Sequence, residues 1–174
     1  MTSERIIWAA LLTAGLSGVA MAQSESNRVG AETDWAVFEG AEPKECWAVT
    51  APSKSVNTRD GNVVTVRRGD VLLFVTYRPT ESVTGEVSFT GGYPFAEGST
   101  ATLDISGTTF ELFTEGEYAW PATPADDQKI VTAIKRGADA VVTARSSRGT
   151  QTKDTFSLLG ATAMIEEAEK RCAG

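Results

Sequence analysis

The chain has 174 residues, with 23 acidic and 16 basic side chains and a formal net charge of -7. An acidic protein repels phosphate backbones, so nucleic-acid binding would need a localised basic patch. The only candidates are Arg67-Arg68 and Arg145 with Arg148, which we interpret as solvated turn charges. The sequence contains no histidine, which excludes Ser-His-Asp and Cys-His catalysis and histidine-based zinc sites.

Residues 1–22 have the order of features that is typical of a secretory signal peptide. Arg5 precedes an apolar run from Ile6 to Val19, which is too short to span a bilayer and is followed by Ala20-Met21-Ala22. We therefore expect cleavage near Gln23 and a periplasmic protein, with secretion or attachment to the cell surface as alternatives. The longest later apolar run, Val71–Val75, is too short for a transmembrane segment.

Two cysteines, Cys46 and Cys172, remain after this cleavage. In an oxidising compartment an even pair favours a disulfide, and here only one pairing is possible. Closing so long a loop would destabilise the unfolded chain by about 5 kcal/mol through lost chain entropy. Two buried thiols, or one reactive cysteine, are the alternatives.

The rest of the chain indicates one domain, residues 34–174, preceded by a polar segment, 23–33, that we predict to be a flexible arm. Short apolar–polar alternations separated by Gly, Pro and Asn turns are typical of β-strands. Residues 51–59 are predicted to form a loop. The predicted strands cover residues 35–38, 46–50, 63–67, 71–77, 85–90, 101–105, 109–113, 118–120, 140–145 and 150–158.

Close strand spacing and hairpin links predict a mainly β fold, an antiparallel β-sandwich of immunoglobulin-like type, with a barrel as the alternative. The near-continuous apolar segment Val71–Tyr77 suits a central strand that is covered on both sides. A single sheet would leave one face of that segment in water, so we favour the sandwich.

A short helix is predicted after Thr123. Thr123 can cap the helix, Pro124 suits its first position, and Asp126 completes a capping box. Gly137 can end the helix in the left-handed conformation. The apolar face would consist of Ile130, Val131 and Ile134.

A second helix is predicted over residues 161–171. Residues at spacings of four, three and four form its inward stripe, and this stripe would bring Cys172 to the face that meets the sheet. A bond to Cys46 requires that orientation. The stripe consists of Ala161, Ile165, Ala168 and Cys172.

The order of several segments resembles the invasion-associated locus B family, secreted proteins of Gram-negative bacteria. The matching segments are Asp34-Trp35-Ala36-Val37, Arg68-Gly69-Asp70-Val71, residues 85–95 (GEVSFTGGYPF) and residues 154–163 (DTFSLLGATA). The resemblance implies a compact β-sandwich exported to the envelope, and the family name refers to host-cell invasion. Many relatives carry a cysteine where this chain has Phe38, so their disulfide pattern does not transfer whole.

Two segments could contribute to an interaction surface. Arg68, Gly69 and Asp70 spell the tripeptide that integrins recognise, although Gly-Asp before a strand is also ordinary turn chemistry. Tyr93 and Phe95, in the segment GGYPF, could form a platform for a ligand or could lie at a corner with their rings in the core. We favour the turn and the corner.

No catalytic residues, cofactor or metal site are predicted, because the acidic pairs show neither a glycosidase arrangement nor a calcium loop. We therefore expect a non-enzymatic exported protein that acts through surface interactions with an envelope or external protein. The alternatives are an envelope hydrolase that uses carboxylates alone and a structural component of the envelope.

Overall fold

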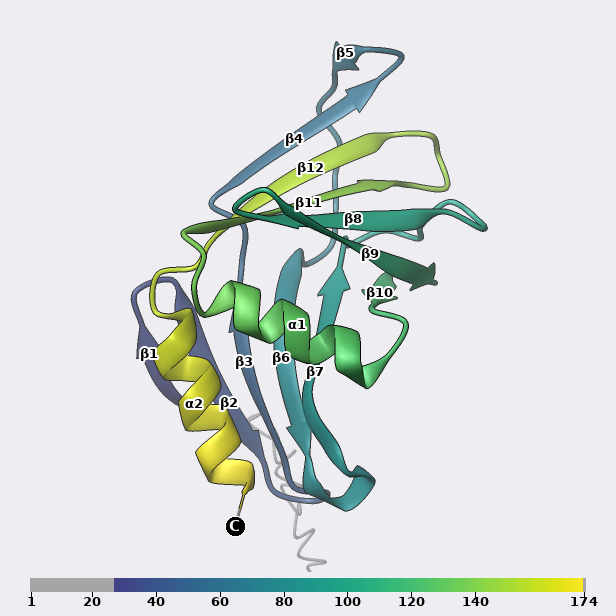
Figure 1. Ribbon diagram of the computed structural model, residues 1–174. Helices are drawn as coiled ribbons and strands as arrows, with labels where there is room; N and C mark the ends of the chain where they lie inside the picture. The colour runs from purple at the N-terminus through teal and green to yellow at the C-terminus, as the bar shows by residue number, and fades with distance from the viewer. Residues whose placement is uncertain (1–26, 174) are drawn as a thin grey trace, which may run out of the picture.

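The computed structural model describes residues 27–173, which form one antiparallel twelve-stranded sheet and two α-helices (Figure 1). The predicted signal peptide and the first residues of the predicted arm lie outside this range. The sheet order is β1-β2-β3-β6-β7-β10-β9-β8-β11-β12-β4-β5. The strands are β1 (Arg28–Glu32), β2 (Trp35–Gly40), β3 (Glu45–Thr50), β4 (Lys54–Arg59), β5 (Asn62–Val63), β6 (Leu72–Arg78), β7 (Val83–Thr90), β8 (Thr100–Ile105), β9 (Thr108–Glu115), β10 (Tyr118–Trp120), β11 (Asp139–Arg145) and β12 (Gln151–Ser157).

The sheet bends so that its two halves share one core. The first half runs from β1 to β10 in the sheet order and the second from β9 to β5, and their strands cross in direction (Figure 1). Phe89 of β7 meets Phe156 of β12 edge-on, with 6.1 Å between ring centroids. The mainly β, antiparallel prediction is confirmed, although the two layers are halves of one continuous sheet. The immunoglobulin-like detail stays a prediction.

Helix α1 (Pro124–Ile134) packs against β7 and begins as predicted. The side chain of Thr123 accepts a hydrogen bond from the backbone N–H of Asp126 at 3.2 Å. Gly137 does not adopt the predicted left-handed conformation. A Cβ at Gly137 would lie 2.8 Å from Ile105 and 2.9 Å from Leu158, so close packing requires the glycine.

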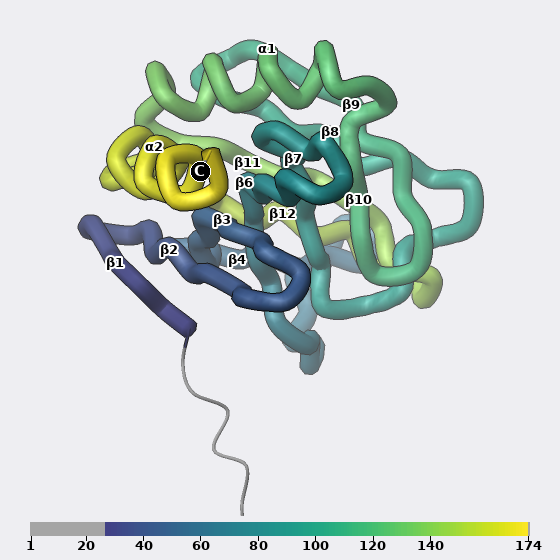
Figure 2. Tube along the Cα trace, turned by 90° about the horizontal axis from the view of Figure 1, so that it is seen from below, coloured from purple at the N-terminus to yellow at the C-terminus, as the bar shows by residue number. Residues whose placement is uncertain are grey.

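Helix α2 (Ala161–Cys172) lies over β2 and β3, and a disulfide joins Cys172 to Cys46 of β3 (Figure 2). The Cα atoms of the two cysteines are 5.9 Å apart. The predicted stripe is buried along its whole length. Both the disulfide and the inward face of this helix are therefore confirmed.

Two segments that we predicted to be irregular are strands. Residues 28–32 of the predicted arm form β1, which pairs with β2, and residues 54–59 of the predicted loop form β4, which pairs with β12. Most of their side chains are exposed or half-buried, so backbone pairing with the neighbouring strand forms them, without any apolar alternation. The arm and loop predictions are wrong for these residues.

The predicted strand 63–67 is also wrong beyond Val63. Strand β5 lies at the far edge of the second half, whereas β6, the next strand in the chain, lies in the first half. Residues 64–71 must therefore cross from one half of the sheet to the other, and they cannot continue the β4–β5 hairpin.

No helix within residues 27–173 combines the length and the apolar character needed to cross a bilayer.

Candidate functional site

The first half of the sheet leaves its outer face open to solvent. On β6, Leu73 and Val75 point into the core, whereas Phe74 and Arg78 point the other way and are only half-buried. The helices and the second half of the sheet cover the inner face alone. The prediction that residues 71–77 are covered on both sides is therefore wrong, and this apolar strand contributes to an exposed surface.

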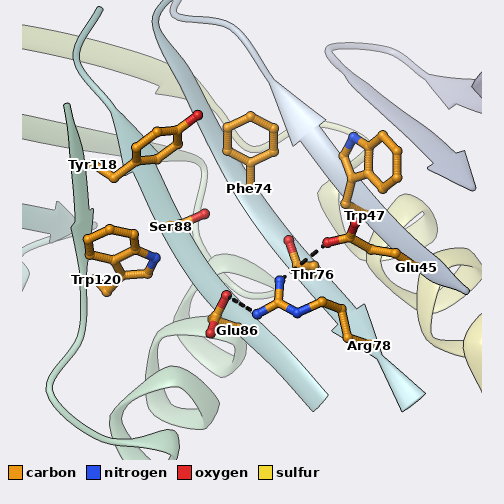
Figure 3. A pocket seen from close by; sticks show the side chains of 9 residues that line it. All are labelled: Glu45, Trp47, Phe74, Thr76, Arg78, Glu86, Ser88, Tyr118 and Trp120. Atoms are coloured by element: carbon orange, nitrogen blue, oxygen red, sulfur yellow. Dashed lines mark hydrogen bonds and ion pairs between the residues drawn. The ribbon is translucent and has the colours of Figure 1, made fainter. Parts of the chain in front are cut away.

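A hollow of about 560 Å³ lies on this outer face, with aromatic side chains on both flanks (Figure 3). Trp47 of β3 stands on one flank, Tyr118 and Trp120 of β10 stand on the other, and Phe74 lies between them. We call this surface the aromatic face. Its lining residues are Glu45, Trp47, Phe74, Thr76, Arg78, Glu86, Ser88, Tyr118 and Trp120.

The rings on both flanks are held by neighbouring rings. Phe38 stacks on Trp47 across the β2–β3 pair, with centroids 5.6 Å apart and planes inclined by 5°. Trp120 lies 5.8 Å from the ring of Tyr118 and 5.6 Å from that of Phe113. Tyr118 and Phe113 are each 46 % exposed. The rings are thus positioned in advance and still accessible, which lowers the entropy cost of binding.

Arg78 lies at one end of the hollow and contacts three carboxylates. Its guanidinium is 3.2 Å from Glu45, 3.0 Å from Glu81 and 2.8 Å from Glu86. Partial burial opposes the positive charge, but hydrogen bonds to these carboxylates, led by Glu86, raise the pKa of Arg78 above its ordinary value. Three acids around one base give this end of the face a local excess of negative charge.

A further carboxylate, Asp127, lies at the edge of a second hollow beside Trp120. It is buried, and its Oδ1 accepts a hydrogen bond from the backbone N–H of Val87 at 2.8 Å. Burial raises the pKa of Asp127, and the charges of Glu86 and Asp126 raise it further, while the Val87 hydrogen bond lowers it. This contact fixes α1 to β7 directly behind the aromatic face.

The structure places the Arg68-Gly69-Asp70 tripeptide partly inside the protein. The Arg68 side chain is 8 % exposed and forms an ion pair with the fully buried Asp154, with Nη2 and Oδ2 2.6 Å apart. The backbone N–H of Gly69 donates to the carbonyl of Gly92 at 2.8 Å, and Asp70 is exposed. Because the Arg68 side chain is paired with Asp154 inside the protein, it is not presented to an external receptor. This supports the turn interpretation.

Tyr93 and Phe95 lie at a corner between β7 and β8. Phe95 is 7 % exposed and belongs to the core, and the Tyr93 ring meets it edge-on at 5.2 Å. The guanidinium of Arg68 lies 5.0 Å from the centre of the Tyr93 ring. Gly92 has φ 68°, and a Cβ there would lie 2.5 Å from the carbonyl oxygen of Gly69. This packing supports the corner interpretation.

Sequence reasoning did not find the aromatic face as a unit. One local signal is the alternation of β3, which puts the half-buried Trp47 on the opposite side from the buried Cys46. A second local signal is the alternation of side chains along β6, which puts Phe74 on the opposite side from Leu73 and Val75. Grouping these rings with Trp120 requires the strand order β3-β6-β7-β10, which the sequence does not state.

Comparisons with known proteins give one structural likeness. No family model matches the sequence, and no curated protein matches it. Among solved structures, the chain is similar to the crystal structure of invasion-associated protein B from Bartonella henselae. The TM-score is 0.56 at 13 % sequence identity, with 83 % of this chain and 98 % of that chain covered. The likeness is one of fold, and that fold agrees with the family that the sequence segments resemble.

Proposed function

We propose that this chain is an exported, non-enzymatic binding protein of the invasion-associated B type. In this proposal it uses the aromatic face to hold a protein partner. The observation that carries the proposal is the gathering of Trp47, Tyr118, Trp120 and Arg78 around one open hollow. The predicted signal peptide and the likeness in fold support the export and the protein type.

The composition of the hollow favours a protein as its ligand. Trp and Tyr are among the residues most enriched at the energetic centres of protein interfaces, and they act from desolvated pockets near the middle of the contact. Here the two tryptophans stand on opposite flanks of a floor that includes the half-buried Phe74, so that a bound segment could contact the rings of both flanks. An apolar side chain of the partner is the group that this geometry suits best.

The charges specify the partner further. Glu45, Glu81 and Glu86 exceed the single positive charge of Arg78, and Glu115 lies in the adjoining hollow. Complementary charge steers association and selects partners. We therefore expect a segment that presents apolar side chains next to lysine or arginine.

The carboxylates support binding over hydrolysis. A carboxylate-only hydrolase needs two acids that face each other across a gap occupied by substrate. Glu45 and Glu86 instead both hydrogen-bond to Arg78, which lies between them (Figure 3).

Panning a phage-displayed library of random twelve-residue peptides against the purified protein tests the proposed ligand. We expect enrichment of peptides that combine large apolar side chains with Lys or Arg. Their affinity should fall by about tenfold or more in Trp120→Ala, as for a central interface residue. Trp120→Phe, which keeps a ring, should lose less.

The matched control is Leu159→Ala, which removes an apolar side chain that is 61 % exposed and lies outside the aromatic face. It should bind the selected peptides like the wild type. Equal binding by Trp120→Ala and Leu159→Ala, or enrichment of acidic peptides, would contradict the proposal. Thermal unfolding of each variant shows whether the protein is folded.

Mass spectrometry of the protein purified from envelope fractions tests the export. We expect a mature chain that begins at Gln23. Native protein that retains Met1 would be incompatible with cleavage of the signal peptide.

A further inference from the structure

A third hollow, of about 430 Å³, lies where three connections of the fold meet. These are the β5–β6 crossing, the β7–β8 corner and the β11–β12 turn. We call it the arginine pocket, because arginines from three separate parts of the sequence line it. Its principal residues are Arg59, Arg67, Arg68, Arg148, Tyr93 and Ser147.

Arg68 provides a rigid wall for this pocket. Its guanidinium donates to the carbonyl of Gly91 and to Asn57, and it makes two hydrogen bonds to Asp154. These bonds use four of the five N–H groups of an arginine side chain. The charge of Arg68 is balanced by Asp154, and the fixed guanidinium lies against the Tyr93 ring.

The other three arginines carry positive charge that the described chain does not balance. No carboxylate of residues 27–173 lies within 4.0 Å of the charged groups of Arg59, Arg67 or Arg148. Arg59 donates instead to the hydroxyl of Thr150 at 2.7 Å. Glu117 is the one carboxylate among the residues that line the pocket.

This local charge is opposite to that of the whole chain, which is -7. Like charges gathered around one hollow repel each other, and a bound anion removes that repulsion. The pocket therefore has the electrostatics of an anion site, in a protein whose remaining surface would repel anions.

The donor types indicate which anion. The planar arginine fork matches the oxygens of carboxylates and phosphates, and several forks that line one hollow suit a tetrahedral group better than a flat one. The Ser147 hydroxyl adds a further donor, while Tyr93 and Pro94 add a less polar wall for the molecule that carries the anion. We propose that the arginine pocket binds a phosphate monoester group.

Phosphate binding is independent of the proposed function, because the arginine pocket and the aromatic face share no lining residue. A phosphate monoester can belong to a small soluble molecule or to a lipid headgroup, and the pocket chemistry is the same for both. The loss of Trp120 should leave phosphate binding intact, and the loss of pocket arginines should leave selection of basic peptides intact.

Isothermal titration calorimetry with glucose 6-phosphate, and with glucose as the uncharged reference, tests the proposal. We expect the protein to bind glucose 6-phosphate but not glucose. The affinity for glucose 6-phosphate should fall by about tenfold or more in Arg67→Gln/Arg148→Gln. Both arginines are exposed, so the fold should persist. The control Arg28→Gln/Arg136→Gln removes the same charge at exposed positions outside the pocket and should bind like the wild type.

Vesicles of phosphatidylcholine with and without phosphatidic acid, a lipid phosphate monoester, identify the carrier. Binding that requires phosphatidic acid and is lost in Arg67→Gln/Arg148→Gln assigns the site to a lipid headgroup. Binding of glucose 6-phosphate without vesicle binding assigns it to soluble phosphates. Absence of binding to both probes, or equal weakening in the two double variants, overturns the proposal.

Discussion

Two arginines, Arg68 and Arg78, are both held by carboxylates, but in opposite ways. Arg68 has one carboxylate partner, Asp154, and the side chains of this pair are 8 % and 0 % exposed. Arg78 has three carboxylate partners and is 23 % exposed on the aromatic face. The first pair is balanced in charge and buried, and the second cluster is unbalanced and accessible to solvent.

The buried pair stabilises the fold, whereas the exposed cluster belongs to the proposed binding surface. Asp154 of β12 and Arg68 of the β5–β6 crossing come from different parts of the chain, so their pair fixes the crossing to the second half of the sheet. Replacing one partner leaves the other charge buried. Around Arg78 a surplus acid is already in contact with water, so changes there should alter ligand choice more than stability.

The largest expected effect is that of Asp154→Ala. It leaves the Arg68 guanidinium buried without its counter-charge, and also removes the acceptor for the Ser55 hydroxyl. We expect a loss of about 3–5 kcal/mol in the free energy of unfolding, measured by urea denaturation.

Arg68→Met/Asp154→Leu is the matched test, because it removes both charges together and keeps their volumes filled. It should be more stable than Asp154→Ala, since no unpaired charge is left buried. A double variant as unstable as Asp154→Ala would assign the loss to packing, and the contrast between the two arginines would then fail.

Arg78→Met should have a much smaller effect on stability, of less than about 1 kcal/mol, because its partners remain hydrated. The same change leaves Glu45, Glu81 and Glu86 without a counter-charge and should strengthen binding of basic peptides selected on the aromatic face. Unfolding and peptide titrations on one preparation measure both quantities. A loss of stability as large as that of Asp154→Ala would contradict the division between the two sites.

High salt should weaken the coupling around Arg78 more than the coupling between Arg68 and Asp154. We expect this effect to be smaller than the effects of the substitutions above. At about 1 M NaCl the Debye length is about 3 Å, so charges in contact with water are screened and buried ones much less. Double-mutant cycles should show that the coupling of Arg78 with Glu86 falls to near zero, while that of Arg68 with Asp154 persists. Equal salt sensitivity of the two couplings would show that both pairs are hydrated.

Asp127 is a buried carboxylate that is not paired with an arginine. Its contribution to the free energy of unfolding should be smaller than that of Asp154 and should depend on pH. Because its pKa is raised from 3.8, the folded protein binds this proton more tightly than the unfolded chain does. Its contribution to stability is present below the unfolded value and is lost as pH rises through the folded pKa. Asp127→Asn cannot ionise, so its stability relative to wild type should rise between about pH 3 and about pH 7.

Asp126→Asn is the control with the opposite sign. Hydrogen bonds from Lys129 and Thr123 lower the pKa of Asp126, so its contribution is present above the unfolded value and is lost as pH falls. Relative to wild type, Asp126→Asn should lose stability as pH rises. Parallel trends in the two variants would be inconsistent with these opposite environments.

Elements with an apolar period were predictable from the sequence, and elements that depend on a neighbour were not. The stripe of α2 and the alternation of β8 appear directly in the sequence, and both are buried as predicted. Strands β1 and β4 are edge-region segments with mostly exposed side chains, so their backbone pairing has no local signature. The pairing of Arg68 with Asp154 has no local signature either, because the two residues are 86 positions apart in the sequence.

The candidate sites were harder to predict than the fold. An apolar run such as 72–75 has the same composition whether one or both of its faces are covered, and only the sheet order shows that Phe74 is accessible. The arginines at 59, 67 and 148 were visible singly, and we interpreted Arg67 and Arg148 as solvated turn charges. Their convergence depends on the crossing between the halves, which follows from pairings distant in the sequence.

The bond between Cys46 and Cys172 has a consequence for the order in which the chain matures. Its second sulfur belongs to the last residue of α2, so no native closure is possible until translation has passed residue 172. During that interval the sulfur of Cys46 lacks the helix that later covers it, and it can exchange with disulfides of other molecules. A ribosome that stalls before residue 172 would release a sheet whose first cysteine has no native partner.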